Sequence, residues 1–337
     1  MEQKVLRVST VVLVGALVLR LISTGVFGSL LNLTLSPQVS SWIVFLQTGR
    51  LMRPVNISFS PESTEDTKPD PTDPTQPEAT LPTEPAPILP VFSPEDAQTL
   101  TITSGFSYSA DLSALLTKPL NWELSADAPT VLIVHSHGSE SFAPTGEYLE
   151  TTPYHTLDKS HNMISIGTYV AQLLEAGGIT VLHDTALHDD PSYNASYNNS
   201  RESIQRYLAQ YPSIRLVLDL HRDSFEDEDG NQIVQTVFSE GTTLAPLMLV
   251  VGTSYGGLEH PNWQENLALA LKLQVQMESL CPGICRNINL RSQRFNQDLS
   301  AGALLVEVGA SGNSRQEALR SAEILAEGIL TLAHGTE

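Results

Sequence analysis

Two short polar segments, each following an apolar run, contain the residue types of a catalytic zinc site. His137 and Glu140 follow shortly after the apolar residues 131–134, and His221 follows the largely apolar segment 214–220. Imidazole nitrogen and carboxylate oxygen both bind zinc, and two histidines with one glutamate leave the fourth coordination position open, as in catalytic sites. We therefore predict that His137, Glu140 and His221 bind Zn²⁺.

A zinc hydrolase also needs a carboxylate near the metal that transfers protons without binding the ion. Glu307 lies in the otherwise apolar segment LLVEVG, where an ionisable side chain is costly unless it has a purpose or a partner. We predict that Glu307 is the general base and then the general acid; the alternative is a buried ion pair with an arginine. Arg222, next to His221, is predicted to stabilise a developing oxyanion or to bind a substrate carboxylate.

Several neighbouring residues leave alternatives open. His135 precedes His137 by two positions and would share its face on an extended strand, so it is an alternative metal ligand. Asp219 or Asp223 could orient a histidine, or either could form a structural ion pair. The polar segment 183–194 is predicted to form a rim or substrate loop, and three residues before the last strand are further candidates for the cleft: Arg291, Arg294 and Asn296.

The segments that must position these residues alternate between strand and helix patterns. Apolar, β-branched runs predict strands at 128–136, 179–184, 214–220, 233–239, 246–252 and 303–309. Helical spacing of apolar residues predicts helices at 162–178, 199–211, 262–280 and 314–333. This alternation predicts an α/β fold with a mostly parallel central sheet and helices on both faces. In such sheets ligands bind at the carboxyl ends of the strands, where the polar segments lie.

The first 96 residues differ in composition from the rest. Residues 1–35 contain an apolar stretch, interrupted by Arg20, that is long enough to cross a bilayer, and the basic Lys4 and Arg7 favour a cytoplasmic N-terminus. We predict an uncleaved membrane anchor; a cleaved signal peptide is the alternative. Residues 36–60 form an amphipathic juxtamembrane segment. Residues 61–96 form a linker, of which residues 61–90 contain nine prolines and seven acidic residues. Residues 97–337 form the catalytic domain, which this arrangement places outside the cytoplasm.

The charge and cysteine content limit the function classes. The net charge of −20 argues against binding nucleic acid through a broad basic surface. The two cysteines, Cys281 and Cys285, exclude a disulfide scaffold, although an extracytoplasmic domain could join them in a local disulfide.

Several motifs recur in the order found in a known family. HSHGSESF, HDDPSYNASYNNSRESI, LDLHRDS, HPNWQENLALALKLQ and LVEVGASGNSRQEA together resemble the stage II sporulation protein P family of cell-wall hydrolases, over roughly residues 97–335. The resemblance implies zinc-dependent cleavage of the N-acetylmuramoyl-L-alanine amide of peptidoglycan during engulfment, and possible endopeptidase activity. It also implies work beside a sporulation lytic transglycosylase and a membrane protein.

By position, the resemblance supports His137, Glu140 and His221 as the metal ligands and Glu307 as the catalytic carboxylate. Two other functions stay open at this point. A zinc peptidase or endopeptidase acting on peptide cross-links would use the same amide chemistry. A non-catalytic scaffold that binds the wall and recruits partners would need no zinc.

Overall fold

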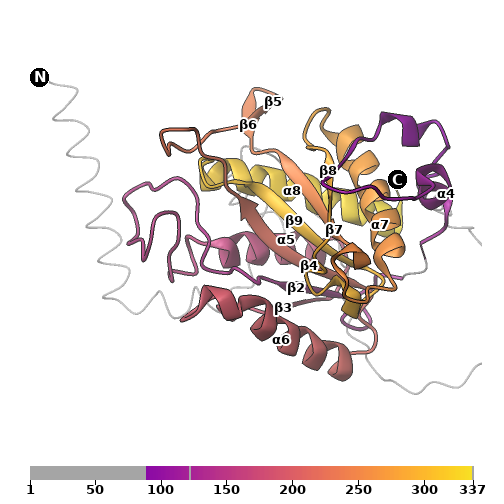
Figure 1. The fold of residues 1–337 in the computed structure, drawn as a ribbon, viewed down its shortest axis with the longest axis horizontal. Helices are drawn as coiled ribbons and strands as arrows, with labels where there is room; N and C mark the ends of the chain where they lie inside the picture. The colour runs from indigo at the N-terminus through magenta and orange to yellow at the C-terminus, as the bar shows by residue number, and fades with distance from the viewer. Residues whose placement is uncertain (1–88, 121–122, 336–337) are drawn as a thin grey trace, which may run out of the picture. The chain divides into compact units, whose positions relative to one another are not determined.

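The computed structural model describes residues 89–120 and 123–335 (Figure 1). The predicted anchor, the juxtamembrane segment and most of the linker fall outside these residues, so their structure is not described. Within the described residues, no helix is both long enough and apolar enough to cross a membrane.

Seven strands form the central sheet in the order β1-β8-β7-β9-β4-β2-β3. The strands are β1 (Ile102–Ser104), β2 (Val131–Val134), β3 (Val181–His183), β4 (Leu216–Asp223), β7 (Leu247–Gly252), β8 (Ile288–Arg291) and β9 (Ala303–Ala310). Strands β9, β4, β2 and β3 are mutually parallel, and so are β1, β8 and β7. The two groups meet in one antiparallel pair, β7 with β9. As a result, β7 and β8 begin at the sheet edge where β2, β4 and β9 end.

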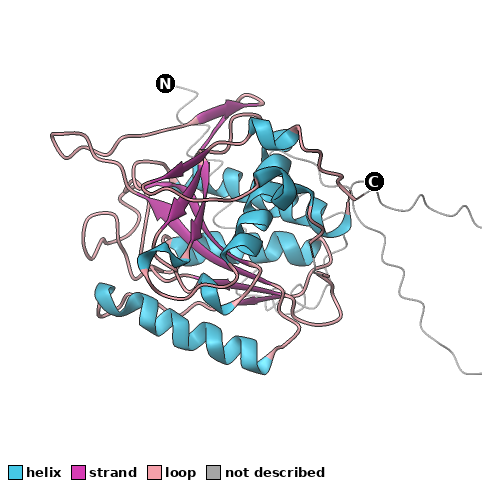
Figure 2. Ribbon diagram, turned by 45° about the vertical axis from the view of Figure 1, so that its right-hand side comes forward, coloured by secondary structure: helices cyan, strands magenta, loops and turns pink. Residues whose placement is uncertain are grey.

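Helices cover both faces of the sheet, as predicted, but unequally (Figures 1 and 2). One face packs against α5 (Met163–Ala176), α7 (Trp263–Leu280) and α8 (Arg315–His334), and the other packs against α6 (Ser196–Gln210). The short helix α4 (Leu112–Thr117) packs on α7. The smaller elements are the helices η1 (Asp96–Thr99), η2 (Tyr193–Ala195), η3 (Ser254–Gly256) and η4 (Gln297–Leu299), and the hairpin β5 (Val237–Ser239) with β6 (Thr242–Leu244).

Successive side chains of β4 point to opposite faces of the sheet, and both faces carry apolar residues that the helices bury. Leu216, Leu218 and Leu220 join the large apolar core under α5, α7 and α8, and Val217 joins the smaller core under α6. All residues of β2 are buried, as expected for a parallel strand covered on both faces. Helix α8 begins with a capping box between Ser314 and Glu317, which satisfies the free N–H groups of its first turn.

The structure confirms the predicted α/β class and the mostly parallel sheet. Of the predicted strand 233–239, only 237–239 is extended, and it belongs to the separate hairpin rather than to the sheet. The predicted helix 199–211 starts three residues earlier, at Ser196. Strands β1, β6 and β8 and helix α4 were not predicted.

Candidate metal centre and active site

His137, Glu140 and His221 come together at the sheet edge where β2 and β4 end. One nitrogen or carboxylate oxygen from each of them lies within 4.8 Å of the others. Nδ1 of His137 is 3.3 Å from Oε1 of Glu140, and Nδ1 of His221 is 3.6 Å from Oε2 of the same carboxylate. All three side chains are buried. His221 lies inside β4, two residues before its end, rather than after the strand as the sequence suggested.

The donor set fits a zinc ion. Ligand atoms at about 2.0–2.1 Å from a tetrahedral zinc lie about 3.3 Å apart, close to the two separations measured here. Charge points the same way, because three buried carboxylates, those of Glu140, Asp219 and Glu307, converge on this site. Among the described groups, Arg222 is the one permanently charged cation beside them. A buried excess of negative charge is costly unless a cation balances it.

Asp219 orients His221. Its Oδ1 lies 2.9 Å from Nε2 of His221, an ion-pair distance, although the two groups are not well aligned for a hydrogen bond. Asp219 is itself fixed by the backbone N–H and the hydroxyl of Ser136, at 2.8 and 2.6 Å. Burial opposes a charged His221, but Asp219 and Glu140 outweigh it and hold the pKa of His221 well above its usual value. Carboxylates that hold the second nitrogen of a metal-binding histidine are common in zinc sites.

Glu307 lies beside the cluster, in the middle of β9. It pairs directly with His221 across the parallel strands β4 and β9. Its residue as a whole is partly exposed, but its Oε2 is buried and has no hydrogen-bond partner among the described residues. Burial raises the pKa of Glu307 to about 8, with a smaller contribution from the charge of Glu140. The alternative, a buried ion pair with an arginine, is not found among the contacts of the described residues.

Arg222 is bound on every side by the protein. Its Nε donates to the carbonyl of Ser141 at 2.9 Å, and one Nη donates to the carbonyl of Tyr154 at 2.8 Å. The other Nη lies 4.0 Å from Oε1 of Glu140. Burial opposes ionisation of Glu140, but the charge of Arg222 and the hydrogen bonds with His137 and His221 hold its pKa well below the usual range. These contacts favour a positioning role for Arg222, while the predicted oxyanion contact stays a prediction.

His135 is not brought to the cluster. Its Nδ1 is 3.0 Å from the carbonyl oxygen of Leu220, and its Nε2 is 2.9 Å from Nε2 of His183. Both ring nitrogens are therefore engaged on the α5 side of the sheet, against Gly167. The expectation that His135 shares a face with His137 is wrong, because β2 ends at Val134 and the chain turns before His137.

A cleft of about 750 Å³ opens beside Glu140 and Arg222. Its walls come from residues 151–157, the predicted rim at 189–193 and residues 224–232. Asp189 fixes the rim to the site by accepting hydrogen bonds from the N–H and hydroxyl of Ser139. The cleft gives the cluster access to a substrate.

Two tyrosines that the sequence did not single out pack on the predicted ligands. The Tyr193 ring stacks on His137 with centroids 4.1 Å apart, and its hydroxyl lies 3.2 Å from Nδ1 of His137. The Tyr197 ring stands edge-on to His137 at 5.3 Å and parallel to His221 at 6.3 Å. In the sequence, the i, i+4 spacing of the two tyrosines could have pointed to a shared site. Aromatic residues that pack in a core show the same spacing, so it does not identify a functional role.

The other candidates serve structural contacts. Asp223 pairs with Arg286 at 2.7 Å, so of the two aspartates it is Asp219 that contacts a histidine. Asn296 donates to the carbonyl of Tyr197 in α6, and Arg294 pairs with Asp298, which also binds Arg201 of α6. Neither Asn296 nor Arg294 lines the cleft. Arg291 is exposed at the end of β8 and does not line the cleft either. Cys281 and Cys285 are free thiols.

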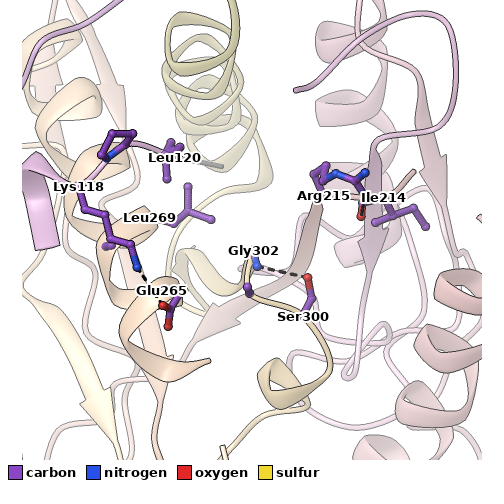
Figure 3. Close-up of a pocket in the computed structure, with 11 residues that line it drawn as sticks. Lys118, Leu120, Ile214, Arg215, Glu265, Leu269, Ser300 and Gly302 are labelled. Carbon is purple, nitrogen blue, oxygen red and sulfur yellow. Dashed lines mark hydrogen bonds and ion pairs between the residues drawn. The ribbon is translucent and has the colours of Figure 1, made fainter. Parts of the chain in front are cut away.

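A second cavity, of about 350 Å³, lies at the opposite edge of the sheet (Figure 3). It is lined by Leu120, Ile214, Arg215, Leu269 and Gly302, and at its mouth Lys118 pairs with Glu265 at 3.0 Å. Since Ile214 and Gly302 precede β4 and β9, this cavity is separated from the candidate metal ligands by the length of those strands. It contains no candidate ligand group for a metal ion, so we do not assign the chemistry to it.

Comparison with protein families gives a match over most of the chain. The model of the family described as Stage II sporulation protein P matches residues 58–330. The Stage II sporulation protein P of Bacillus subtilis (strain 168) is 28% identical over 216 residues, which cover 61% of this chain and 51% of that protein. The match thus spans about half the length of the curated relative.

Among solved structures, two amidases are similar to parts of this chain. The N-acetylmuramoyl-L-alanine amidase AmiC2 of Nostoc punctiforme has a TM-score of 0.37 and 19% identity, over 60% of this chain and 96% of that one. The N-acetylmuramyl-L-alanine amidase Ami1 of Mycobacterium smegmatis has a TM-score of 0.38 and 12% identity, over 62% and 98%.

Proposed function

This chain belongs to the Stage II sporulation protein P family, and from that premise we propose that it is a zinc-dependent peptidoglycan hydrolase that cleaves the N-acetylmuramoyl-L-alanine amide bond during engulfment in sporulation. The observation that carries the proposal is the cluster of His137, Glu140 and His221 with Glu307 beside it. This set supplies three ligands and a separate proton carrier, which are the two requirements of zinc-dependent amide hydrolysis.

The residues divide the work as follows. His137, Glu140 and His221 would hold the zinc. When bound, zinc lowers the pKa of a coordinated water to about 7 and polarises a carbonyl. Glu307 would take the proton of the attacking water and return it to the leaving nitrogen of L-alanine. Its pKa of about 8 suits a group that must both accept and release a proton near neutral pH. Asp219 would keep Nδ1 of His221 directed at the metal.

Digestion of purified sacculi by the full-length chain tests this proposal. We expect the wild type to release peptides whose L-alanine amine is free and to leave intact lactyl groups on the glycan. His221→Ala should lose both zinc and activity, while Glu307→Ala should keep stoichiometric zinc and lose activity. Full activity of Glu307→Ala, together with no stoichiometric zinc in the wild type, would overturn the proposal.

The same digest separates the proposal from its alternatives. New peptide amines on stems that are still attached to muramic acid would indicate an endopeptidase acting on cross-links. Retention of the sacculi without any cleavage product would indicate a wall-binding scaffold.

We further propose that residues 1–35 anchor the protein as a single-pass membrane protein with the catalytic domain outside the cytoplasm. There it would act beside a sporulation lytic transglycosylase and a membrane scaffold protein. Protease added to intact cells should then digest the catalytic domain, and cross-linking in sporulating cells should capture the two partners. Protection from external protease would contradict the predicted topology.

A further inference from the structure

A third pocket lies at the same edge of the sheet as the proposed metal ligands. It measures about 310 Å³ and is lined by Thr103, Gln235, Met248, Arg286, Asn287 and Asn289. We call it the amide pocket, because three of its six residues carry side-chain amides. Neither the proposed metal site nor the mechanism uses any of these residues.

A row of side chains connects the amide pocket to the proposed metal site. His221 pairs with Glu307 across β4 and β9, and Glu307 pairs with Met248 across β9 and β7. Met248 lines the amide pocket. Since neighbouring strands are about 4.8 Å apart, the pocket begins roughly 10 Å from His221. A substrate whose scissile bond lies at the cluster can therefore extend over Glu307 into this pocket.

The row lies on the face of the sheet where α6 packs, but beyond that helix. Met248, Val250 and Leu305 form a small apolar cluster of their own, and the partly buried Phe295 packs against it. Asn289 pairs with Val250 on one side and with Thr103 on the other, so all three lie in one row across the sheet. In the described part of the chain, no helix contributes an apolar side chain to this cluster, whose three members are buried. Polar side chains border it at the amide pocket.

Three of the polar groups of the amide pocket are held in place by other side chains. Asn287 donates to the hydroxyl of Thr103 at 3.2 Å. The Arg286 guanidinium pairs with Asp223 at 2.7 Å and lies over the ring of Phe225, 4.4 Å from its centroid. Groups fixed before binding lose little entropy when a ligand arrives, so this surface suits specific recognition.

The two pockets beside the metal site differ in charge. Four carboxylate residues line the cleft: Glu140, Asp189, Asp190 and Glu226. No carboxylate residue lines the amide pocket, whose polar groups are amides, a hydroxyl and one guanidinium. Amides can donate to and accept from the hydroxyl and acetamido groups of a sugar, whereas the acidic cleft suits the amino groups of a stem peptide.

We propose that the amide pocket binds the glycan strand of the substrate, so that the scissile bond lies over Glu307 and the stem peptide enters the acidic cleft. This inference rests on the proposed peptidoglycan hydrolase function and adds to it the direction in which the substrate lies.

Binding of full-length protein to glycan strands freed of their peptides tests the inference without requiring turnover. The informative variant is Asn287→Ala combined with Gln235→Ala, because both side chains are exposed and their loss does not threaten the fold. We expect this double variant to bind the peptide-free strands at least tenfold more weakly than the wild type. The control is Gln210→Ala, which removes an exposed amide at the end of α6, near the opposite edge of the sheet, and should bind as the wild type does.

A second measurement, binding of a free stem peptide, fixes the direction of the substrate. The double variant should bind the peptide as the wild type does, and weaker peptide binding with unchanged glycan binding would overturn the inference. Unchanged binding of both ligands, or a wild type that cleaves sacculi yet does not bind peptide-free strands, would also overturn it. In that last case the proposed hydrolase function would stand.

Discussion

His221 contacts an acidic group at each of its two ring nitrogens. The role of the contact with Asp219 can be tested by substitution. Nδ1 faces Glu140 at 3.6 Å, and Nε2 faces Asp219 at 2.9 Å. If Nδ1 binds zinc, the charge of Asp219 makes the imidazole a stronger donor and fixes the ring orientation.

We therefore predict that Asp219→Asn lowers zinc affinity by about tenfold to a hundredfold, the range typical of such partners. The matched control is Asp223→Asn, on the same strand, because Asp223 pairs with Arg286 instead. Titration of zinc into the metal-free proteins with a competing chelator measures the effect. Equal affinity of Asp219→Asn and the wild type would show that this carboxylate does not support a metal ligand.

The contact between the buried His135 and the half-buried His183 predicts a loss of stability in acid. Burial lowers the pKa of His183 from 6.5 to about 4. Below pH 6.5 the unfolded chain takes up a proton that the folded chain refuses, so the stability contributed by the neutral ring is present above pH 6.5 and is lost toward pH 4. From pH 7 to pH 5 this one group should lower the free energy of unfolding by about 1–2 kcal/mol.

The measurement is denaturant unfolding of the metal-free protein at both pH values, for the wild type and His183→Gln. The variant is expected to be less stable at pH 7, but its stability should fall less between pH 7 and pH 5. The same fall in both proteins would assign the acid sensitivity to other groups.

At this scale the convergence of His137, Glu140 and His221 could be predicted from the sequence, while their surroundings could not. A carboxylate inside an apolar strand, such as Glu307, stands out because its burial is costly without a role. Tyr193 and Tyr197 did not stand out, because aromatic residues at helical spacing occur just as often in cores. The position of His135 depended on where β2 ends, and a difference of one or two residues there reverses the face of a side chain.

Among the elements, α5 shows how closely a helix approaches the strands β2 and β3. A Cβ atom built on Gly167 would lie 2.4 Å from Nε2 of His135 and 2.7 Å from Nε2 of His183. Glycine is a poor helix former because of its conformational freedom. Its presence in the interior of α5 is therefore explained by the lack of space for a Cβ atom at this position.

Gly167→Ala is accordingly expected to destabilise the fold by about 2 kcal/mol, even though alanine is the better helix former by about 1 kcal/mol. A suitable control is Gly328→Ala in α8, where a Cβ would meet Met277 and Leu273 at 3.1 and 3.2 Å. Those two side chains can shift, so the control should change stability by less than about 1 kcal/mol. Denaturant unfolding of both variants measures the difference, and an equal effect would contradict the packing argument.

The elements that the sequence missed share a physical cause. Strands β1 and β8 are short and present polar side chains such as Thr103 and Asn289 to one face, so no apolar run marks them. The antiparallel direction of β7 against β9 was also beyond prediction, because strand pairing is a long-range choice that local pattern does not record. Both omissions concern the half of the sheet that bears the amide pocket.

For the whole molecule, the important junction is the one between the two parallel halves of the sheet. The proposed ligands come from β4 and from the turn after β2, Glu307 comes from β9, and the amide pocket begins on β7. A metal ion held by His137, Glu140 and His221 would therefore connect segments more than eighty residues apart in the chain.

Zinc binding should then stabilise the entire fold, because the ligands converge only in the folded chain. At a free zinc concentration a hundred times the dissociation constant, the gain is about 2.7 kcal/mol. For a domain of this size that corresponds to a rise in melting temperature of about 5–10 °C, because each kcal/mol shifts it by about 2–4 °C. Calorimetry of the wild type with zinc and with excess chelator measures the shift, and His221→Ala should show almost none. A shift of equal size in His221→Ala would mean that zinc stabilises the protein at some site other than the one formed by β2 and β4.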